Sequence, residues 1–272
     1  FGEKYKFPIK TSMKISVTII GHNEVDHLRE LLPELQWASE IVYVDCESHD
    51  QSLTVAKDNG CKVFSRPNNH NLNINKSYSM EQATGEWLFY IDPDERLPVK
   101  LVNEIIDAVK DTPHSAFRLN RRNHYFGHWL RHGSQYPDSQ LRLFRKGKAS
   151  FPNQHVHEKL VVDGSIGKLS NDMLHFPYQN ISQFLRKFNF YTGVEAVYLK
   201  DAGLEINFLN TLSYTLLKPL TRFIRRYIFK GGFRDGLPGL FCSVFDALNY
   251  VVRYFKLWEM KQQNSGNKET EL

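Results

Sequence analysis

Short β-branched segments alternate with segments of helical leucine spacing along the first hundred residues. Residues 14–20 (KISVTII) and 40–45 (EIVYVD) have the composition of buried strands. Between them, the four leucines from Leu28 to Leu35 lie on one face of a helix predicted over 26–37. The pattern therefore predicts a strand, a helix and a second strand.

The same alternation continues toward the middle of the chain. Helices are predicted over 51–59 and 73–84, and strands over 61–65 and 86–91. A further helix is predicted over 97–110. Apolar strands separated by helices indicate a mostly parallel, Rossmann-like sheet covered on both faces, so the predicted fold class is α/β.

The pattern of apolar and polar residues changes after residue 115. Residues 115–162 contain short apolar runs between polar, glycine and proline positions, which predicts mixed or antiparallel strands with long loops. An acceptor or substrate half is expected there. Beyond residue 176, apolar side chains recur at helical spacing. These positions are Phe184, Phe188, Tyr191, Val194 and Tyr198.

Composition sets broad limits on the class of protein. The 272 residues are 41% hydrophobic and 24% charged, which suits a globular protein of one large domain, alone or with an appendage. The net charge of +5 is concentrated late in the chain. Three scattered cysteines, Cys46, Cys61 and Cys242, form neither a disulfide framework nor a zinc motif, which favours a reducing compartment. No signal peptide is visible, and residues 1–13 are expected to be an extension or a cloning remnant.

Two predicted strands end on an aspartate, at Asp45 and Asp92. Because ligands bind beyond the carboxyl ends of parallel strands, both carboxylates are expected on one rim of the sheet. Asp94 and Glu95 follow Asp92 closely, and so many carboxylates together need compensation by a cation or by ordered water. The simpler alternative is that aspartate favours turns after strands.

The loop after the first strand, Gly21-His-Asn-Glu24, has no G-x-G-x-x-G and no Walker sequence. This disfavours a dinucleotide-dependent dehydrogenase and a P-loop NTPase. The Asp92-Pro-Asp94 triplet instead suits a divalent ion that neutralises a substrate diphosphate, since magnesium commonly takes one or two carboxylates plus phosphate oxygens.

The motifs SVTIIGHNE, VYVDCESHDQS, the region of Lys76 and the DPD run occur in the order found in one known family. Over residues 14–111 the chain resembles the inverting family 2 glycosyltransferases of GT-A fold. The later YPDSQLRLFRKG, VHEKL and KGGFRDGLPG stretches extend a narrower resemblance to about residue 258. It is to the bacterial lipopolysaccharide core β-1,4-glucosyltransferases that act on the inner-core heptose.

The resemblance assigns roles to individual residues. It implies nucleotide contacts by Ile19, Gly21, His22, Glu24, Asp45, Lys76 and Asp92. It also implies that Asp92 and Asp94 carry Mg²⁺ or Mn²⁺ and that UDP-glucose is the donor. The sequence departs from the family in the D-C-E-S-H-D run after the second strand, where small residues are usual, so contacts by Ser48 and Asp50 are left open.

An inverting transfer needs one base for the acceptor hydroxyl. Glu158 in the VHE run corresponds by resemblance to the family's base, and Asp138 is the second candidate. The structural alternative is that Glu158 is a surface residue of a strand, without a catalytic role. Arg142 has the planar donor fork to bind a phosphate, although an alternating strand with Arg142 facing water fits equally well. His155 and His157 could chelate zinc with His175, but acceptor contacts or packing are favoured.

The end of the chain is basic and aromatic. Lys218, Arg222, Arg225, Arg226 and Lys230 recur at helical spacing among apolar residues, and a second amphipathic helix begins near residue 237. Such helices can lie in a membrane surface and meet anionic lipid. A helical subdomain packed on the core is the alternative, and nucleic acid binding is disfavoured because no known motif is present.

These inferences combine into one hypothesis. Residues 14–178 form the GT-A catalytic domain, with a nucleotide-binding half (14–111) and an acceptor half (112–178). Residues 179–261 form a membrane-associating helical region, and 262–272 a disordered tail. The protein is expected to glucosylate the lipopolysaccharide core heptose as a peripheral enzyme at the cytoplasmic face of the inner membrane. The alternatives are another UDP-sugar and another lipid- or protein-linked acceptor, or a non-catalytic nucleotide-sugar-binding protein, and the oligomeric state is left open.

Overall fold

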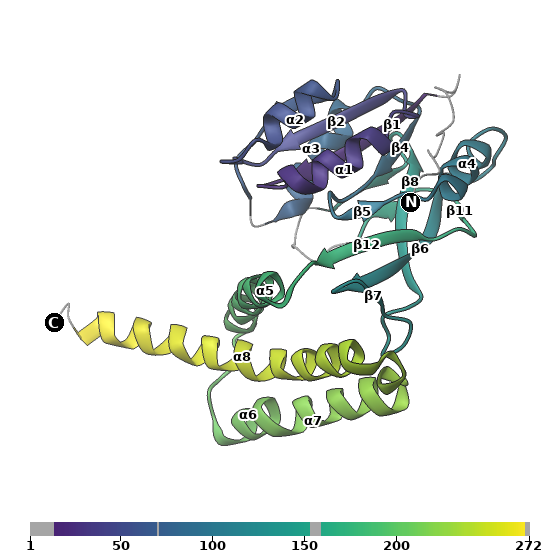
Figure 1. The fold of residues 1–272 in the computed structure, drawn as a ribbon. Coiled ribbons are helices and arrows are strands. Elements are labelled where there is room, and N and C mark those ends of the chain that lie inside the picture. Colours follow the sequence, from purple (N-terminus) through teal and green to yellow (C-terminus); the bar gives the residue numbers. More distant parts are fainter. Residues whose placement is uncertain (1–13, 70, 153–158, 270–272) are drawn as a thin grey trace. The chain divides into compact units, whose positions relative to one another are not determined.

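The computed structural model of the chain describes residues 14–69, 71–152 and 159–269 (Figure 1). The chain divides into two compact units. The first comprises Phe1–Arg122 and Asp138–His175, and the second Asn123–Pro137 and Phe176–Leu272. The short segment Asn123–Pro137 therefore belongs with the C-terminal helices, although it lies within the part of the sequence predicted to be the acceptor half.

The first half of the chain alternates strands and helices, as its apolar pattern predicts. The strands are β1 (Ile15–Gly21), β2 (Glu40–Asp45), β3 (Lys62–Ser65) and β4 (Trp87–Tyr90). The helices are α1 (Val25–Glu34), α2 (Ser52–Asp58), α3 (Leu72–Gln82) and α4 (Val99–Ala108). All eight predicted elements are confirmed, and α1 ends before the predicted residue 37 because a turn follows Leu35.

The remaining strands are short or antiparallel, as predicted for residues 115–162. They are β5 (Glu95–Arg96), β6 (Ala116–Tyr125), β7 (His128–Trp129), β8 (Asp138–Arg145), β9 (Ala149–Ser150), β10 (Val161–Val162), β11 (Ile166–Lys168) and β12 (Met173–Tyr178). In the described residues the main sheet has the order β3-β2-β1-β4-β8-β6-β12-β5. Strands β3, β2, β1 and β4 are mutually parallel, and β8 runs antiparallel to β4.

Both faces of the parallel strands are buried. On one face, Ile15, Val17 and Ile19 of β1 belong to a core that includes leucines of α1 and of α4. On the other, Val42 and Leu88 pack in a core with Met80 of α3. The strands are therefore apolar on both sides, which explains their nearly continuous hydrophobic runs. The predicted α/β class of GT-A type with C-terminal helices is confirmed.

The second unit is mainly helical. Its helices are α5 (Ile181–Asp201), α6 (Phe208–Leu212), η1 (Ser213–Leu217), α7 (Lys218–Phe223), η2 (Ile224–Phe229), η3 (Gly232–Asp235) and α8 (Gly236–Glu269). The four segments from α6 to η2 follow one another without a break, so residues 208–229 form one continuous helix. The backbone of α8 continues to Glu269, through most of the stretch predicted to be a disordered tail. Within the described residues, no helix combines the length and apolarity needed to cross a bilayer.

Candidate active site

The loops after β1 and β2 are joined by hydrogen bonds. The Asn23 backbone N–H donates to Ser48 Oγ (2.9 Å), and the His49 N–H donates to Asn23 Oδ1 (2.8 Å). The first N–H of α1, on Val25, donates to Asp50 Oδ2 at 3.2 Å, which satisfies one of the unpaired donors at the helix start. Ser48 and Asp50, whose roles the sequence left open, thus hold the β1–α1 loop in place.

Asp45 and Gly21 lie side by side at the carboxyl ends of neighbouring strands. They are register partners between β1 and β2, and Asp45 is buried. The Asp45 carboxylate accepts a hydrogen bond from the Ser48 N–H (3.1 Å). A Cβ at position 21 would lie 2.9 Å from the Tyr43 hydroxyl oxygen, which explains the glycine. These residues form a small polar rim, together with His22, whose Nδ1 lies 2.7 Å from the Cys46 carbonyl oxygen.

Asp92 follows β4 and is surrounded by donors. Arg142 Nη2 donates to Asp92 Oδ2 at 2.7 Å, and the Tyr90 hydroxyl donates to Oδ1. Lys76 Nζ of α3 lies 4.0 Å from the same Oδ1. The antiparallel register of β4 and β8 pairs Phe89 with Leu143, so the next step along the ladder sets Arg142 beside Tyr90. The strand register therefore brings a cation from β8 to the end of β4.

Glu95 is the most deeply buried acid of this region, with a fully enclosed side chain. Its Oε1 accepts hydrogen bonds from Arg142 Nη2 (2.6 Å) and Arg121 Nη1 (3.0 Å), and its Oε2 accepts from the Asp92 N–H (2.9 Å). Arg121 also pairs with Asp138 at 2.9 Å. The cations that the cluster of carboxylates requires are thus supplied in large part by arginines from β6 and β8.

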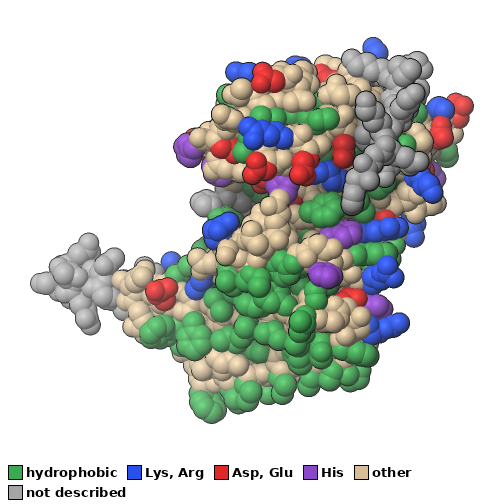
Figure 2. Space-filling view, in the orientation of Figure 1, with side chains coloured by type: hydrophobic (Ala, Val, Ile, Leu, Met, Phe, Trp, Pro, Cys, Tyr) green, Lys and Arg blue, Asp and Glu red, His purple; other side chains and the backbone are tan. Residues whose placement is uncertain are grey.

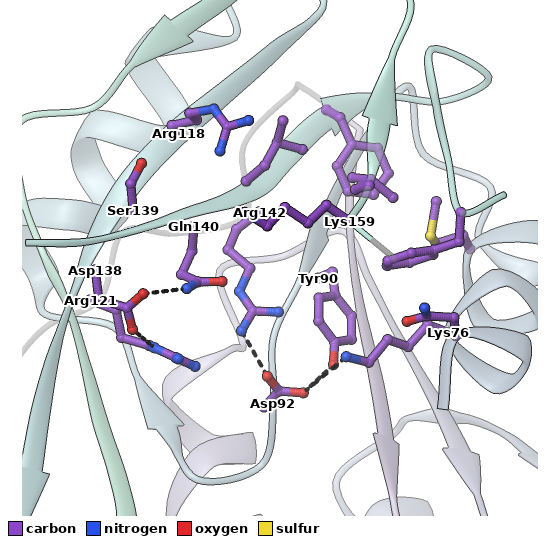
Figure 3. A pocket seen from close by; sticks show the side chains of 16 residues that line it. Lys76, Tyr90, Asp92, Arg118, Arg121, Asp138, Ser139, Gln140, Arg142 and Lys159 are labelled. Carbon is purple, nitrogen blue, oxygen red and sulfur yellow. Dashed lines mark hydrogen bonds and ion pairs between the residues drawn. The ribbon is translucent and has the colours of Figure 1, made fainter. Parts of the chain in front are cut away.

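A cavity of about 480 Å³ opens beside these groups (Figure 3). Its lining carries five cationic side chains, on Lys76, Arg118, Arg121, Arg142 and Lys159. Two carboxylates, of Asp92 and Asp138, also line it. The cationic excess makes the cavity suited to an anionic ligand such as a diphosphate.

The ionisation of the pocket groups follows from their surroundings. Burial alone would raise the pKa of the Asp92 carboxyl, but the charges of Arg142 and Lys76 outweigh it and hold that pKa well below its usual range. Burial and the neighbouring Asp92 carboxylate raise the pKa of Tyr90 well above its usual value. Burial lowers the pKa of Lys76, and Asp92 opposes part of that effect. The Tyr90 hydroxyl therefore remains a proton donor to an ionised Asp92.

This environment predicts a pH dependence of stability. A carboxyl with a lowered folded-state pKa contributes stability above its unfolded pKa, ordinarily 3.8 for aspartate, and loses the contribution as the pH falls. We expect the difference in unfolding free energy between wild type and Asp92→Asn to be constant from about pH 5 to 8 and to shrink below about pH 4. Urea unfolding across this range measures it, with the exposed Asp26→Asn as control. A difference that stays unchanged as the pH falls from about 5 to about 2 would contradict the assigned ionisation.

Asp94 points toward a different partner from Asp92. Its Oδ1 lies 3.5 Å from His175 Nε2 of β12, and both side chains are largely buried. A carboxylate oxygen and an imidazole nitrogen suit a divalent ion that completes its coordination with substrate phosphates. In the described part of the chain, no group of three or more His, Cys, Asp or Glu side chains could hold a metal by itself.

The structure describes only one of the two candidate bases, Asp138. Asp138 lines the cavity, where both of its oxygens accept hydrogen bonds, from Arg121 Nε (2.9 Å) and Gln140 Nε2 (2.7 Å). Glu158 lies outside the described residues, as do His155 and His157 of the considered zinc site. Arg142, for which a water-facing position was an equal alternative, is buried and ion-paired.

Lys76, Asp92, Asp138 and Arg142 line the cavity. Gly21 and Asp45 lie at the carboxyl ends of β1 and β2, which is the same edge of the sheet as the end of β4 that precedes Asp92, because the three strands are parallel. Ile19 is buried in the core. The Glu24 N–H donates to Ser52 Oγ at 2.9 Å.

Among the polar residues that line the cavity, Arg118, Arg121, Gln140 and Lys159 were not predicted as site residues. The pairing role of Glu95 was not predicted either. The DPDE run signalled Glu95, but nothing local in the sequence connects it to arginines on later strands.

Residues 16–163 match the sequence profile of glycosyl transferase family 2, which is more than half of the chain. The chain belongs to this family. It is therefore an enzyme of the glycosyltransferase class, as the ordered motifs predicted. The profile includes Gly21, Asp45 and all of the described residues that line the cavity.

Curated relatives of this family 2 glycosyltransferase come from bacteria. The lipopolysaccharide core biosynthesis glycosyltransferase LpsC of Rhizobium meliloti is 27% identical over 256 residues, covering 91% of this chain and 93% of that protein. An uncharacterized glycosyltransferase of Rickettsia felis is 25% identical, covering 93% and 99%. The chain is thus a distant relative of a lipopolysaccharide core enzyme along nearly its whole length.

Among solved structures, similarity is found to S. aureus TarS 1–349 in complex with UDP-GlcNAc. The identity is 15%, the TM-score 0.46, and the match covers 88% of this chain and 82% of that chain. Glucosyl-3-phosphoglycerate synthase from Mycobacterium tuberculosis in complex with Mn²⁺ and UDP-glucose has 19% identity and a TM-score of 0.34, covering 41% and 44%. These neighbours bind UDP-sugars, one of them with Mn²⁺.

Proposed function

We propose that this family 2 enzyme transfers glucose from UDP-glucose, with inversion, to the inner-core heptose of lipopolysaccharide. The observation that carries the proposal is the cationic cavity at the end of β4, where Lys76 and Arg142 flank Asp92. The relationship to a lipopolysaccharide core glycosyltransferase supports the acceptor class. Because such an acceptor carries lipid chains, the reaction would take place at the cytoplasmic face of the inner membrane.

The donor would be held by its diphosphate and its nucleoside. In this proposal, Lys76 and Arg142 neutralise the diphosphate, while Asp45 and the Gly21 backbone hold the uridine with His22 and Glu24. Asp92 and Asp94, with His175 beside Asp94, would hold Mg²⁺ or Mn²⁺ against the phosphates. Asp92 would also orient Lys76 and Arg142. The bound ion would supply a Lewis acid that stabilises charge on the departing diphosphate.

The transfer itself would be a single displacement. The acceptor hydroxyl oxygen forms a bond to the anomeric carbon while the bond from that carbon to the UDP oxygen breaks. The hydroxyl proton passes to a carboxylate on the face opposite UDP, and UDP leaves with the bonding electron pair. Glu158 is the proposed base. Asp138 is less suited to this role, because Arg121 and Gln140 already occupy its oxygens.

Glu158→Gln tests the base. We expect this change to lower the transfer rate by about 10²- to 10⁴-fold while UDP binding is retained, because only proton removal is lost. Single-turnover transfer and calorimetric UDP binding measure the two effects. Glu81→Gln, at an exposed position of α3, is the matched control. A larger loss with Asp138→Asn than with Glu158→Gln would move the base to Asp138.

A panel of UDP-sugars tests the donor and acceptor. UDP release is measured with each sugar nucleotide in Mg²⁺ or Mn²⁺, with and without heptose-bearing core acceptor. We expect release with UDP-glucose that rises when the acceptor is added. Release with a different UDP-sugar would support the alternative donor, and release without stimulation by the core would support another acceptor. UDP binding with no release for any sugar would support a non-catalytic binding protein.

A further inference from the structure

The continuous helix of residues 208–229 has one face that is bound to α8. Tyr214 is buried and stacks on Tyr254 with ring centroids 5.1 Å apart. Thr211 Oγ1 lies 2.9 Å from the Tyr254 hydroxyl, and Arg226 Nη1 lies 2.8 Å from Asp246 Oδ2. Arg222 also bonds to Asp246. The polar and aromatic contacts of this helix are thus directed inward, toward its neighbour.

The other face of the same helix is apolar and exposed. Its stripe repeats every four residues. The exposed members of this stripe are Phe208, Leu212, Leu216, Leu220 and Ile228. At the end of the helix, Phe229 is 79% exposed, and Leu237 at the start of α8 is 80% exposed. Figure 2 shows apolar side chains gathered over α6 and α7. A contiguous apolar surface of this kind marks an interaction site, unlike single exposed leucines.

Positive charge flanks this apolar face. Residues 206–234 contain no Asp or Glu but six Lys or Arg. Arg222 and Arg226 are used in the contact with α8, whereas Arg225, Lys230 and Arg234 are exposed. The exposed cations lie at the end of the helix that also carries Phe229, and Phe233 is exposed beside them. Apolar bulk and positive charge therefore share one end of the surface.

We propose that the outer face of helix 208–229 lies in the plane of an anionic bilayer. Its leucines and phenylalanines would enter the acyl boundary, while Arg225, Lys230 and Arg234 meet lipid phosphates. None of the described helices is long and apolar enough to cross the membrane, which agrees with in-plane attachment. A second copy of the chain is a poorer occupant, because the same surface of that copy offers these cations no carboxylate, residues 206–234 having no Asp or Glu.

This surface is narrower than the region expected from the sequence, which included both C-terminal helices. The proposal concerns lipid binding and does not depend on sugar transfer, so this proposal and the proposed function can fail separately.

The apolar part of the surface is tested with Leu216→Gln and Leu220→Gln combined, using vesicles of phosphatidylcholine and phosphatidylglycerol. We expect vesicle binding to weaken about tenfold or more, because two exposed leucine side chains that would enter the bilayer are lost. Val161→Gln with Ile166→Gln, two exposed β-strand positions of the other unit, is the control and is expected to bind as wild type.

The charged part is tested with Arg225→Glu, Lys230→Glu and Arg234→Glu combined. We expect binding to weaken about 100-fold on anionic vesicles, with little change on pure phosphatidylcholine. Lys57→Glu, Lys100→Glu and Lys168→Glu make the same charge change at exposed positions elsewhere and serve as control. Equal losses in the test and control variants would overturn the proposal. The proposal would also be overturned if sedimentation showed that the wild type is a dimer and that the Leu216 and Leu220 variant is a monomer.

Discussion

Asp94→Ala is expected to reduce sugar transfer by about 10³-fold, because the change removes the carboxylate proposed to hold the divalent ion against the donor diphosphate. The loss should appear in the transfer step and in the metal dependence of donor binding. Lys76 and Arg142 line the cavity and are unchanged in this variant, so their direct contacts with the phosphates should survive. Residual UDP binding in the absence of metal is therefore expected to equal that of the wild type.

Two measurements separate this role from a structural one. Calorimetry of UDP binding with and without Mn²⁺ should show that the variant has lost the stimulation by metal, and electron paramagnetic resonance should show no bound Mn²⁺ in the presence of UDP. Asp107→Ala, which removes an exposed carboxylate paired with Lys110, is the control and should retain both. If Asp94→Ala kept metal-stimulated binding and full transfer, the metal assignment would be wrong.

Glu95→Gln is expected to lower the unfolding free energy by about 3 kcal/mol, since it leaves Arg142 and Arg121 with one fewer counter-charge in a buried site. Arg142 is buried and also pairs with the Asp92 carboxylate. Loss of the Glu95 charge therefore leaves two guanidinium groups to share Asp92 and Asp138. Denaturant unfolding monitored by circular dichroism measures the change.

A matched control variant separates the effect of burial on stability from the effect of ion pairing alone. Glu86 pairs with Arg145 at 2.6 Å but is 58% exposed. Glu86→Gln is therefore expected to change the unfolding free energy by less than about 1 kcal/mol, because solvent screens an exposed pair. Similar effects of the two substitutions would show that Glu95 is not the centre of a buried charge cluster. A stability loss for Glu95→Gln with normal donor binding would separate its structural role from ligand contact.

The layout of the first half could be predicted because it depends on local pattern. The leucine spacing of α1 and the β-branched runs of β1 and β2 indicate which faces are buried. Asp45 and Asp92 come directly at the ends of strands. The charge pairs could not be predicted in this way. Glu95 meets Arg121 and Arg142, which lie 26 and 47 residues later in the sequence. Only the antiparallel insertion of β8 beside β4 brings them together.

The same limit applies to the loops that follow β1 and β2. The D-C-E-S-H-D run looked unlike the usual family sequence, and its side chains gave no local indication of their partners. In the folded chain, Ser48 and Asp50 bind backbone N–H groups of Asn23 and Val25. Parallel pairing of β1 with β2 sets these two loops next to each other, so the partners are decided by sheet topology.

The sequence alone determined the α/β architecture, the family and the strand ends that carry acidic residues. These follow from apolar periodicity and motif order, which are properties of contiguous segments. Tertiary structure decided which cations neutralise Asp92 and Glu95, and which face of residues 208–229 is left outward. Both depend on contacts between distant segments. The apolar residues of that helix have the same periodicity whether α8 covers them or solvent meets them, and in the folded unit α8 covers the opposite face.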